Sequence, residues 1–139
     1  MMANEFAGLQ AFVVAVLKAD PAVTALTGQR IYDKVPANPK PPYVSLGTDD
    51  AVPDDYECIP GVIDALQIDV WDDGVGSKKR LKQVTAAIKA ALHEYDGPLD
   101  LAGNDALAEL QVTGVRHARD PDGVSFHGVV TIEATIEEV

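Results

Sequence analysis

Residues 120–130 read Asp-Pro-Asp-Gly-Val-Ser-Phe-His-Gly-Val-Val, which is a turn followed at once by an alternating segment. Pro121 fixes φ at the second turn position, Asp122 tolerates the third, and Gly123 gives the backbone the freedom to leave the turn. After the turn, apolar and polar side chains alternate up to Glu137. The positions of the apolar face are Phe126, Gly128, Val130, Ile132, Ala134 and Ile136. This alternation predicts a long, half-buried strand that the turn joins to its predecessor.

The turn itself, Asp120, Pro121, Asp122 and Gly123, is interpreted as a structural hairpin device. Two acids separated by a proline are similar to half of a calcium loop. A complete loop of that kind needs further oxygen ligands at regular positions and a closing glutamate. Here the chain runs directly into an apolar strand, so we expect no metal site and no catalytic site at the turn.

The rest of the sequence predicts alternating blocks of helix and strand. Helices are expected over residues 4–18, from Asp20-Pro21 to Gly28, and from Ser77 to Glu94, where Ser77 would be the N-cap. The expected strands are residues 30–35, 43–47, 62–71, 99–101, 108–116 and 124 onward. This order predicts an α+β fold, in which a mostly antiparallel sheet packs against two main helices. The length fits one domain, residues 1–139.

Composition excludes several classes of protein. A hydrophobic content of 47% argues against disorder, and no apolar run reaches the roughly twenty residues that span a membrane. The start of the chain has no basic segment typical of a secretory signal, so synthesis in the cytoplasm is expected. With one cysteine, Cys58, no intrachain disulfide can form.

The net charge of −11 is opposite in sign to that of a generic nucleic-acid binder, because phosphate contacts come from Lys and Arg. Two interpretations stay open. The acidity could simply keep the protein soluble. Alternatively, an acidic wall could line a passage through which DNA slides without sticking.

Acidic side chains gather in residues 48–61, which are predicted to be a long polar loop. The acids of this segment are Asp49, Asp50, Asp54, Asp55 and Glu57. A loop of this length in a small domain is either mobile or functional, so we expect it to contact another subunit or a partner. Residues 36–42, which hold four prolines, are predicted to be a second, stiff and exposed loop.

Basic side chains gather at the start of the helix that follows residue 77. The candidates for an interaction surface are Lys78, Lys79, Arg80 and Lys82, with Lys89 further along. They are either a solvated helix face or a patch that meets the acidic segment of a neighbouring copy. Complementary charge of this kind sets the register of an interface more than its affinity. Direct contact with DNA is a third, weaker interpretation.

The sequence contains no complete motif that would indicate an enzyme. Residues 73–79, Asp-Gly-Val-Gly-Ser-Lys-Lys, lack the glycine spacing and the Gly-Lys-Ser/Thr order of a phosphate-binding loop. His93, His117 and His127 do not have the spacing of metal ligands, and His127 is expected on the partly exposed face of the last strand. No serine is marked as an activated nucleophile. We therefore expect no catalytic residue, cofactor or metal.

Several segments, in the same order, resemble the small tail-completion proteins of long-tailed phages and prophages. Residues 28–36 and 42–47 are similar to that family's "Gly-x-Arg-Ile-Tyr-Asp-x-Val-Pro" and "Pro-Tyr-Val-x-Leu-Gly" segments. Residues 66–71 resemble its central strand, which commonly ends in Trp. A helix like that of residues 77–94 follows, and the family also ends in Asp-Pro-Asp-Gly…His-Gly.

The resemblance implies a structural protein of the virion, not an enzyme. Copies would close into a ring, sixfold by family analogy, that caps the finished tail tube, ends its polymerisation and binds the head-tail connector. DNA would pass through the ring without specific binding, and no membrane would be involved. The protein would lie at the end of the tail that faces the head, after assembly in the host cytoplasm. The alternative is a small binding module or assembly chaperone unrelated to tails.

Overall fold

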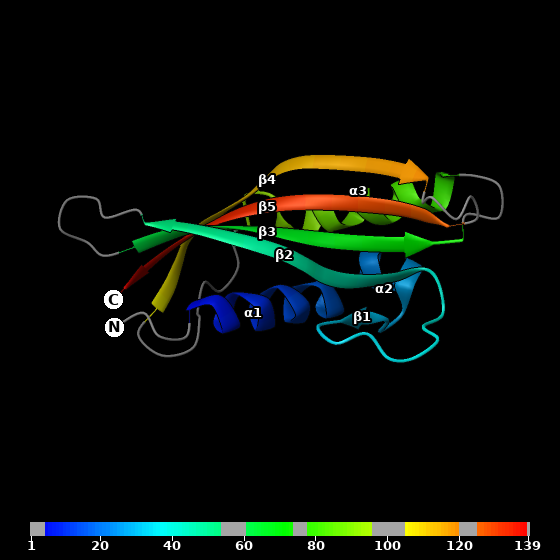
Figure 1. The fold of residues 1–139 in the computed structure, drawn as a ribbon, viewed down its shortest axis with the longest axis horizontal. Coiled ribbons are helices and arrows are strands. Elements are labelled where there is room, and N and C mark those ends of the chain that lie inside the picture. The colour runs from blue at the N-terminus through cyan, green and yellow to red at the C-terminus, as the bar shows by residue number, and fades with distance from the viewer. Residues whose placement is uncertain (1–4, 54–60, 74–77, 96–104, 120–124, 139) are drawn as a thin grey trace.

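A computed structural model of the chain describes residues 5–53, 61–73, 78–95, 105–119 and 125–138. The fold is α+β, as predicted, with a mostly antiparallel sheet of five strands and three helices (Figure 1). The elements are α1 (Glu5–Ala19), α2 (Pro21–Thr27), β1 (Ile31–Tyr32), β2 (Tyr43–Pro53), β3 (Gly61–Asp72), α3 (Lys79–Leu92), β4 (Asp105–Arg119) and β5 (Phe126–Glu138). No single described helix is long and apolar enough to cross a membrane. Together, α1 and α2 have the length and apolar composition, but the pair is bent by 82°.

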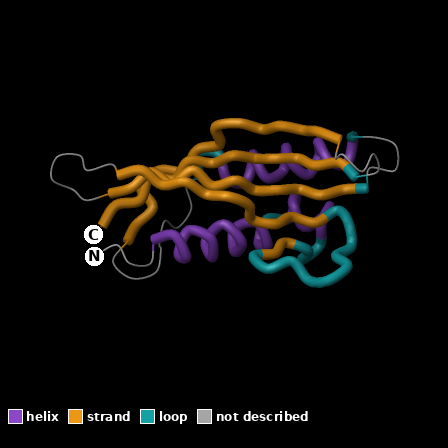
Figure 2. Tube along the Cα trace, in the orientation of Figure 1, coloured by secondary structure: helices purple, strands orange, loops and turns teal. Residues whose placement is uncertain are grey.

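The strands lie in the order β1-β2-β3-β5-β4, and four of them run side by side along the length of the molecule (Figure 2). Only β1 and β2 are parallel, and every other neighbouring pair is antiparallel. The strand β5 is therefore internal, between β3 and β4. The sheet edges belong to β4 on one side and to β1 with the rest of β2 on the other.

The core fills the space between the helices and one face of the sheet. Val130, Ile132, Ala134 and Ile136 are fully buried on β5, which confirms the alternation predicted from the sequence. The helices contribute Leu9, Val13, Leu17, Val23, Leu81, Val84, Ile88 and Leu92, all fully buried. Gly128 allows close packing here, because a Cβ at this position would lie 2.8 Å from a methyl carbon of Thr85. The sheet therefore has one covered face and one face without helices.

The predicted boundaries of α2 are confirmed. The Asp20 carboxylate accepts hydrogen bonds from the backbone N–H groups of Ala22 (2.9 Å) and Val23 (3.1 Å), as an N-cap does. Gly28 ends the helix with φ at +59°, a conformation that glycine adopts without strain. The helix α3 begins later than expected, at Lys79, and its N-cap Lys78 makes no side-chain capping bond. Ser77 lies outside the described residues.

Several strand boundaries were predicted wrongly. The second strand does not stop at Gly47 but continues to Pro53, so Thr48, Asp49 and Asp50 are not in a loop. Asp49 and Asp50 pair with Leu66 and Ala65 of β3, and backbone pairing of this kind is indifferent to polar side chains that point into solvent. Likewise β4 extends over residues 105–119, whereas the first strand shrinks to two residues.

One further predicted segment has the expected structure, and two others lie outside the described residues. Residues 36–42 form a mostly exposed connection without helix or strand, as predicted. The expected strand at 99–101 and the turn residues Asp120, Pro121, Asp122 and Gly123 lie outside the described residues.

Candidate interaction surfaces

Two basic residues of α3, Lys82 and Lys89, line a groove between this helix and the edge strand β4. The groove has a volume of about 360 Å³ and is lined by Lys82, Thr85, Ala86, Lys89, Val115 and His117. The sequence prediction included Lys82 and Lys89 but did not place residues of the strand at 108–116 beside them. Next to the groove, β4 also carries the exposed side chains of Arg116 and Arg119. The predicted strand ended at Arg116, so the pattern gave no reason to align Arg119 with the helix.

The pKa of His117 is influenced by the lysines beside this groove. Its Nε2 lies 2.7 Å from the hydroxyl oxygen of Thr85. The pKa of His117 is lowered, first by burial and then by the ammonium groups of Lys82 and Lys78. The neutral imidazole is therefore favoured in the folded protein.

Arg80 has a different role from the lysines beside it. Its guanidinium donates to the Asp72 carboxylate through Nε (2.9 Å) and Nη2 (2.5 Å), and to Asp73 through Nη2 (3.2 Å). The Asp72 side chain is fully buried, and its hydrogen bond is the main cause of the raised pKa of Arg80. Much of the bonding capacity of Arg80 is thus used inside the subunit, where it ties the start of α3 to the end of β3.

Lys78, Lys79 and Lys82 remain candidates for contact with a partner. Lys79 and Lys82 are exposed and Lys78 is partly exposed. The sequence predicted one patch at the start of the helix, made of Lys78, Lys79, Arg80 and Lys82. In the structure Arg80 differs from the three lysines, because it is bonded to Asp72. The lysines and the two arginines of β4 form the surface that we call the basic edge: Lys78, Lys79, Lys82, Lys89, Arg116 and Arg119.

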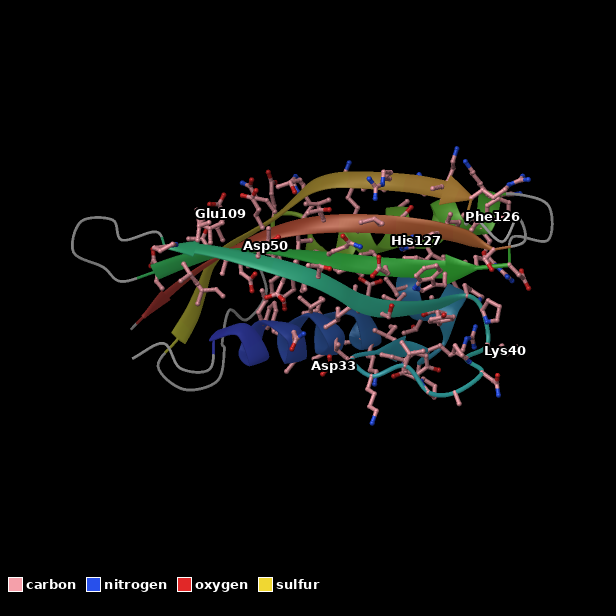
Figure 3. All side chains as sticks on the ribbon, in the orientation of Figure 1. Asp33, Lys40, Asp50, Glu109, Phe126 and His127 are labelled. Carbon is pink, nitrogen blue, oxygen red and sulfur yellow. The ribbon has the colours of Figure 1, made fainter. Side chains whose placement is uncertain are left out.

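The acidic candidates lie on the other side of the sheet. Asp49 and Asp50 are exposed on the second half of β2, and Asp50 is labelled in Figure 3. The strand order separates β2 from β4 by β3 and β5, so one subunit cannot bring these acids to its own basic edge. Asp54, Asp55 and Glu57 lie outside the described residues.

The open face of the sheet carries an ordered polar cluster that sequence reasoning missed. The Nε2 of His127 lies 2.7 Å from Oδ1 of Asp69, which also accepts a hydrogen bond from the Gln67 amide at 2.8 Å. The His127 ring stacks on Trp71, with centroids 3.9 Å apart and planes 3° from parallel. His127 is partly exposed on β5, as expected (Figure 3). Only the cross-strand register, His127 with Trp71, brings these residues together.

The histidines stay separate from one another. His93, after α3, accepts a hydrogen bond at Nδ1 from the backbone N–H of Val112 (3.0 Å), whereas His117 and His127 have the partners given above. Within the described parts of the chain, no group of three His, Cys, Asp or Glu side chains is arranged to hold a metal ion.

Comparison with known proteins places this geometry in a family. The family model of the tail completion protein gp17 matches residues 11–137, which is nearly the whole chain. The chain belongs to this tail-completion family. The resemblance inferred from separate sequence segments is thereby confirmed, and this family is one of structural proteins of phage tails.

Solved structures agree with the family assignment. A chain of the virion of a native gene transfer agent particle matches this tail-completion chain with a TM-score of 0.85 and 28% sequence identity. The match covers 95% of the present chain and 96% of the other. No curated protein sequence matches the chain.

Proposed function

We propose that this tail-completion protein closes into a ring at the end of the tail that faces the head. There the ring ends polymerisation of the tail tube and binds the head-tail connector. The observation that supports this role best is the similarity, over 95% of this chain, to a chain of a virion particle. The protein acts through its surfaces and has no catalytic step.

The distribution of charge supports assembly by contacts between different faces. A closed ring of identical copies uses heterologous contacts, in which one patch of each copy meets a different patch of the next. This chain separates its basic edge from Asp49 and Asp50 by the width of the sheet. Lys78, Lys79 and Lys82 on one side, and Asp49 and Asp50 on the other, are the residues that we assign to subunit or partner contacts. Asp54, Asp55 and Glu57 are proposed to take part in the same contacts.

The net charge of −11 also fits a channel for DNA. Phosphates are repelled by carboxylates, so an acidic lining would let DNA pass through the ring without being retained. We propose that DNA crosses the ring in this way, with no sequence-specific contact.

Electron microscopy of particles tests the proposed role. Cells that produce the particle without this chain should contain tails of uncontrolled length, together with separate heads. Supplying the wild-type chain should restore joined particles with uniform tails. Normal particles in the absence of the chain would overturn the proposal.

A further inference from the structure

Both edges of the sheet are covered over only part of their length. On one side, β1 pairs with Val44 and Ser45 of β2, and this contact ends before Leu46. Beyond it, among the described residues, no strand lies against the outer side of β2 from Leu46 to Pro53. This open stretch contains Asp49 and Asp50.

The edge strand β4 is covered in a different way. The backbone N–H of Glu94 donates to the carbonyl oxygen of Leu110 (3.0 Å), and Nδ1 of His93 accepts from the N–H of Val112 (3.0 Å). The end of α3 therefore satisfies the outward backbone groups of β4 at these two positions. From Gly114 to Arg119 no described strand covers the edge, and this stretch contains Arg116 and Arg119.

The two open stretches complement one another. One is acidic and the other basic, and each also carries an exposed apolar side chain. Val52 on β2 is 56% exposed and Val115 on β4 is 39% exposed; only Val35 joins them as an exposed large apolar residue of the described chain. Open strand edges pair readily with other strands, because their N–H and C=O groups lack partners.

Strand direction is also compatible. Since β2, β3, β5 and β4 alternate in direction, β4 runs antiparallel to β2 of the same copy. A neighbouring copy that continued the sheet in the same orientation would therefore present its β2 antiparallel to β4, the arrangement of an ordinary antiparallel ladder.

The positions of the charged residues along the strands define how far neighbouring copies must be shifted along the strand direction. Asp50 is level with Ala65, Ala65 with Glu133, and Glu133 with Gln111. Arg116 comes five residues after Gln111 in the sequence, so bringing Asp50 opposite Arg116 requires a stagger along the strands. A stagger of this kind is what a sheet needs to close into a ring of tilted strands, typically at about 35–45°.

We infer that copies of this chain join by strand pairing, with residues 114–119 of β4 in one copy against residues 47–52 of β2 in the next. The inference rests on the proposed ring and specifies its subunit contact. Asp50 lies opposite Arg116, and the lysines of α3 border the contact on its helix side. Arg116 and Arg119, which the sequence prediction did not include, become determinants of assembly.

Charge-reversed variants test the contact in the purified full-length protein. We expect Arg116→Glu with Arg119→Glu to weaken self-association by at least about a hundredfold, since juxtaposed like charges cost several kcal/mol. Asp49→Lys with Asp50→Lys should do the same. The matched control is Lys34→Glu with Lys40→Glu, which changes the net charge equally in the exposed stretch after β1. Analytical ultracentrifugation measures association, and circular dichroism checks that each variant is folded.

Mixing the two reversed variants provides the decisive result. Each fails alone, but the glutamates of one variant match the lysines of the other, so a mixture should recover an alternating oligomer. In a Cys58→Ser background, Ala51→Cys with Val115→Cys should give covalent oligomers on oxidation, because this register places the two residues opposite one another. Lys40→Cys with Val115→Cys should stay uncrosslinked.

The outcomes separate the contact from the proposed function. Unchanged association of both folded variants, or no recovery on mixing, would overturn the strand contact while leaving the tail role to the microscopy of particles. A wild-type chain that stays monomeric at all accessible concentrations would also overturn the contact. The charged side chains would then serve only to keep open edges apart, as they do on many edge strands.

Discussion

Arg80, at the start of α3, holds the buried carboxylate of Asp72, at the end of β3, through two hydrogen bonds. The two residues are eight positions apart in the chain and bracket residues 74–77, which lie outside the described parts. The pair therefore fixes the point at which the chain leaves the sheet and enters the helix.

Replacing Arg80 with Met should destabilise the subunit by about 2–3 kcal/mol, because Asp72 would keep a buried charge that has lost its main cation. This is less than the loss of a fully enclosed pair, since 41% of the Arg80 side chain is exposed. Urea unfolding monitored by circular dichroism measures the change. Lys82→Met, on the same helix, should change stability by no more than about 0.5 kcal/mol. Equal losses in the two variants would contradict the anchoring role of Arg80.

Gly128→Ala should destabilise the core by about 1–3 kcal/mol, the usual cost of overpacking. The new Cβ would lie 2.8 Å from Thr85 Cγ2 and 3.1 Å from Leu81 Cδ1. Gly114→Ala is the matched control, because among the described residues no atom beyond the two chain neighbours lies within 4 Å of a Cβ there. Thermal unfolding of the two variants should separate them clearly. A Gly128→Ala variant as stable as wild type would show that α3 can move away from β5 without loss.

Asp20→Ala should cost about 1 kcal/mol, because two N–H groups at the start of α2 would lose their acceptor. Asp20→Asn should cost much less, since the Asn side-chain oxygen accepts the same bonds. The difference between the two free energies of unfolding is the informative quantity. If Asn and Ala were equally destabilising, the negative charge and not the hydrogen bonds would be responsible.

The pKa of His117 gives a prediction about pH. Because its folded pKa lies below the usual value of about 6.5, the unfolded chain binds more protons in the interval between the two values. Stability from this group is complete above about pH 6.5 and declines as the pH falls toward the folded pKa. His117→Asn should reduce this decline, as measured by urea unfolding between pH 5 and 7.5.

The cause of this pKa shift can be tested separately. Lys82→Ala should raise the pKa of His117, since one of the positive charges that oppose protonation is removed. Lys40→Ala, in the connection between β1 and β2, should leave it unchanged. NMR titration of the imidazole resonances measures both values. An unchanged pKa after Lys82→Ala would leave burial and the charge of Lys78 as the causes.

The sequence predicted those features that depend on local chemistry. The caps of α2 were found because Asp20 and Gly28 act within a few residues of their own positions, and the buried face of β5 was found because alternation is a property of one strand. The length of β2 was missed because aspartate is uncommon in strands. Asp49 and Asp50 are extended here because they pair with β3.

Features that depend on register could not be predicted. The stacking of His127 on Trp71 joins residues 56 positions apart, and His117 and Lys82 line one groove only because α3 packs beside β4. The basic patch expected on the helix stays a prediction, to which the basic edge adds Arg116 and Arg119 of β4. Its strand component follows from the topology of the sheet, which no local pattern contains.

The internal position of β5 bears on when a newly made chain can begin to associate. The ribosome produces β5 after every other described strand, yet β5 must enter between β3 and β4 before the sheet exists as one unit. A nascent chain lacking it can hold β2 with β3 but cannot place β4. The two outer edges thus acquire their fixed separation only once β5 has been synthesised. A prematurely terminated chain would therefore present at most one of the two edges to a growing particle and could not make contacts through both edges.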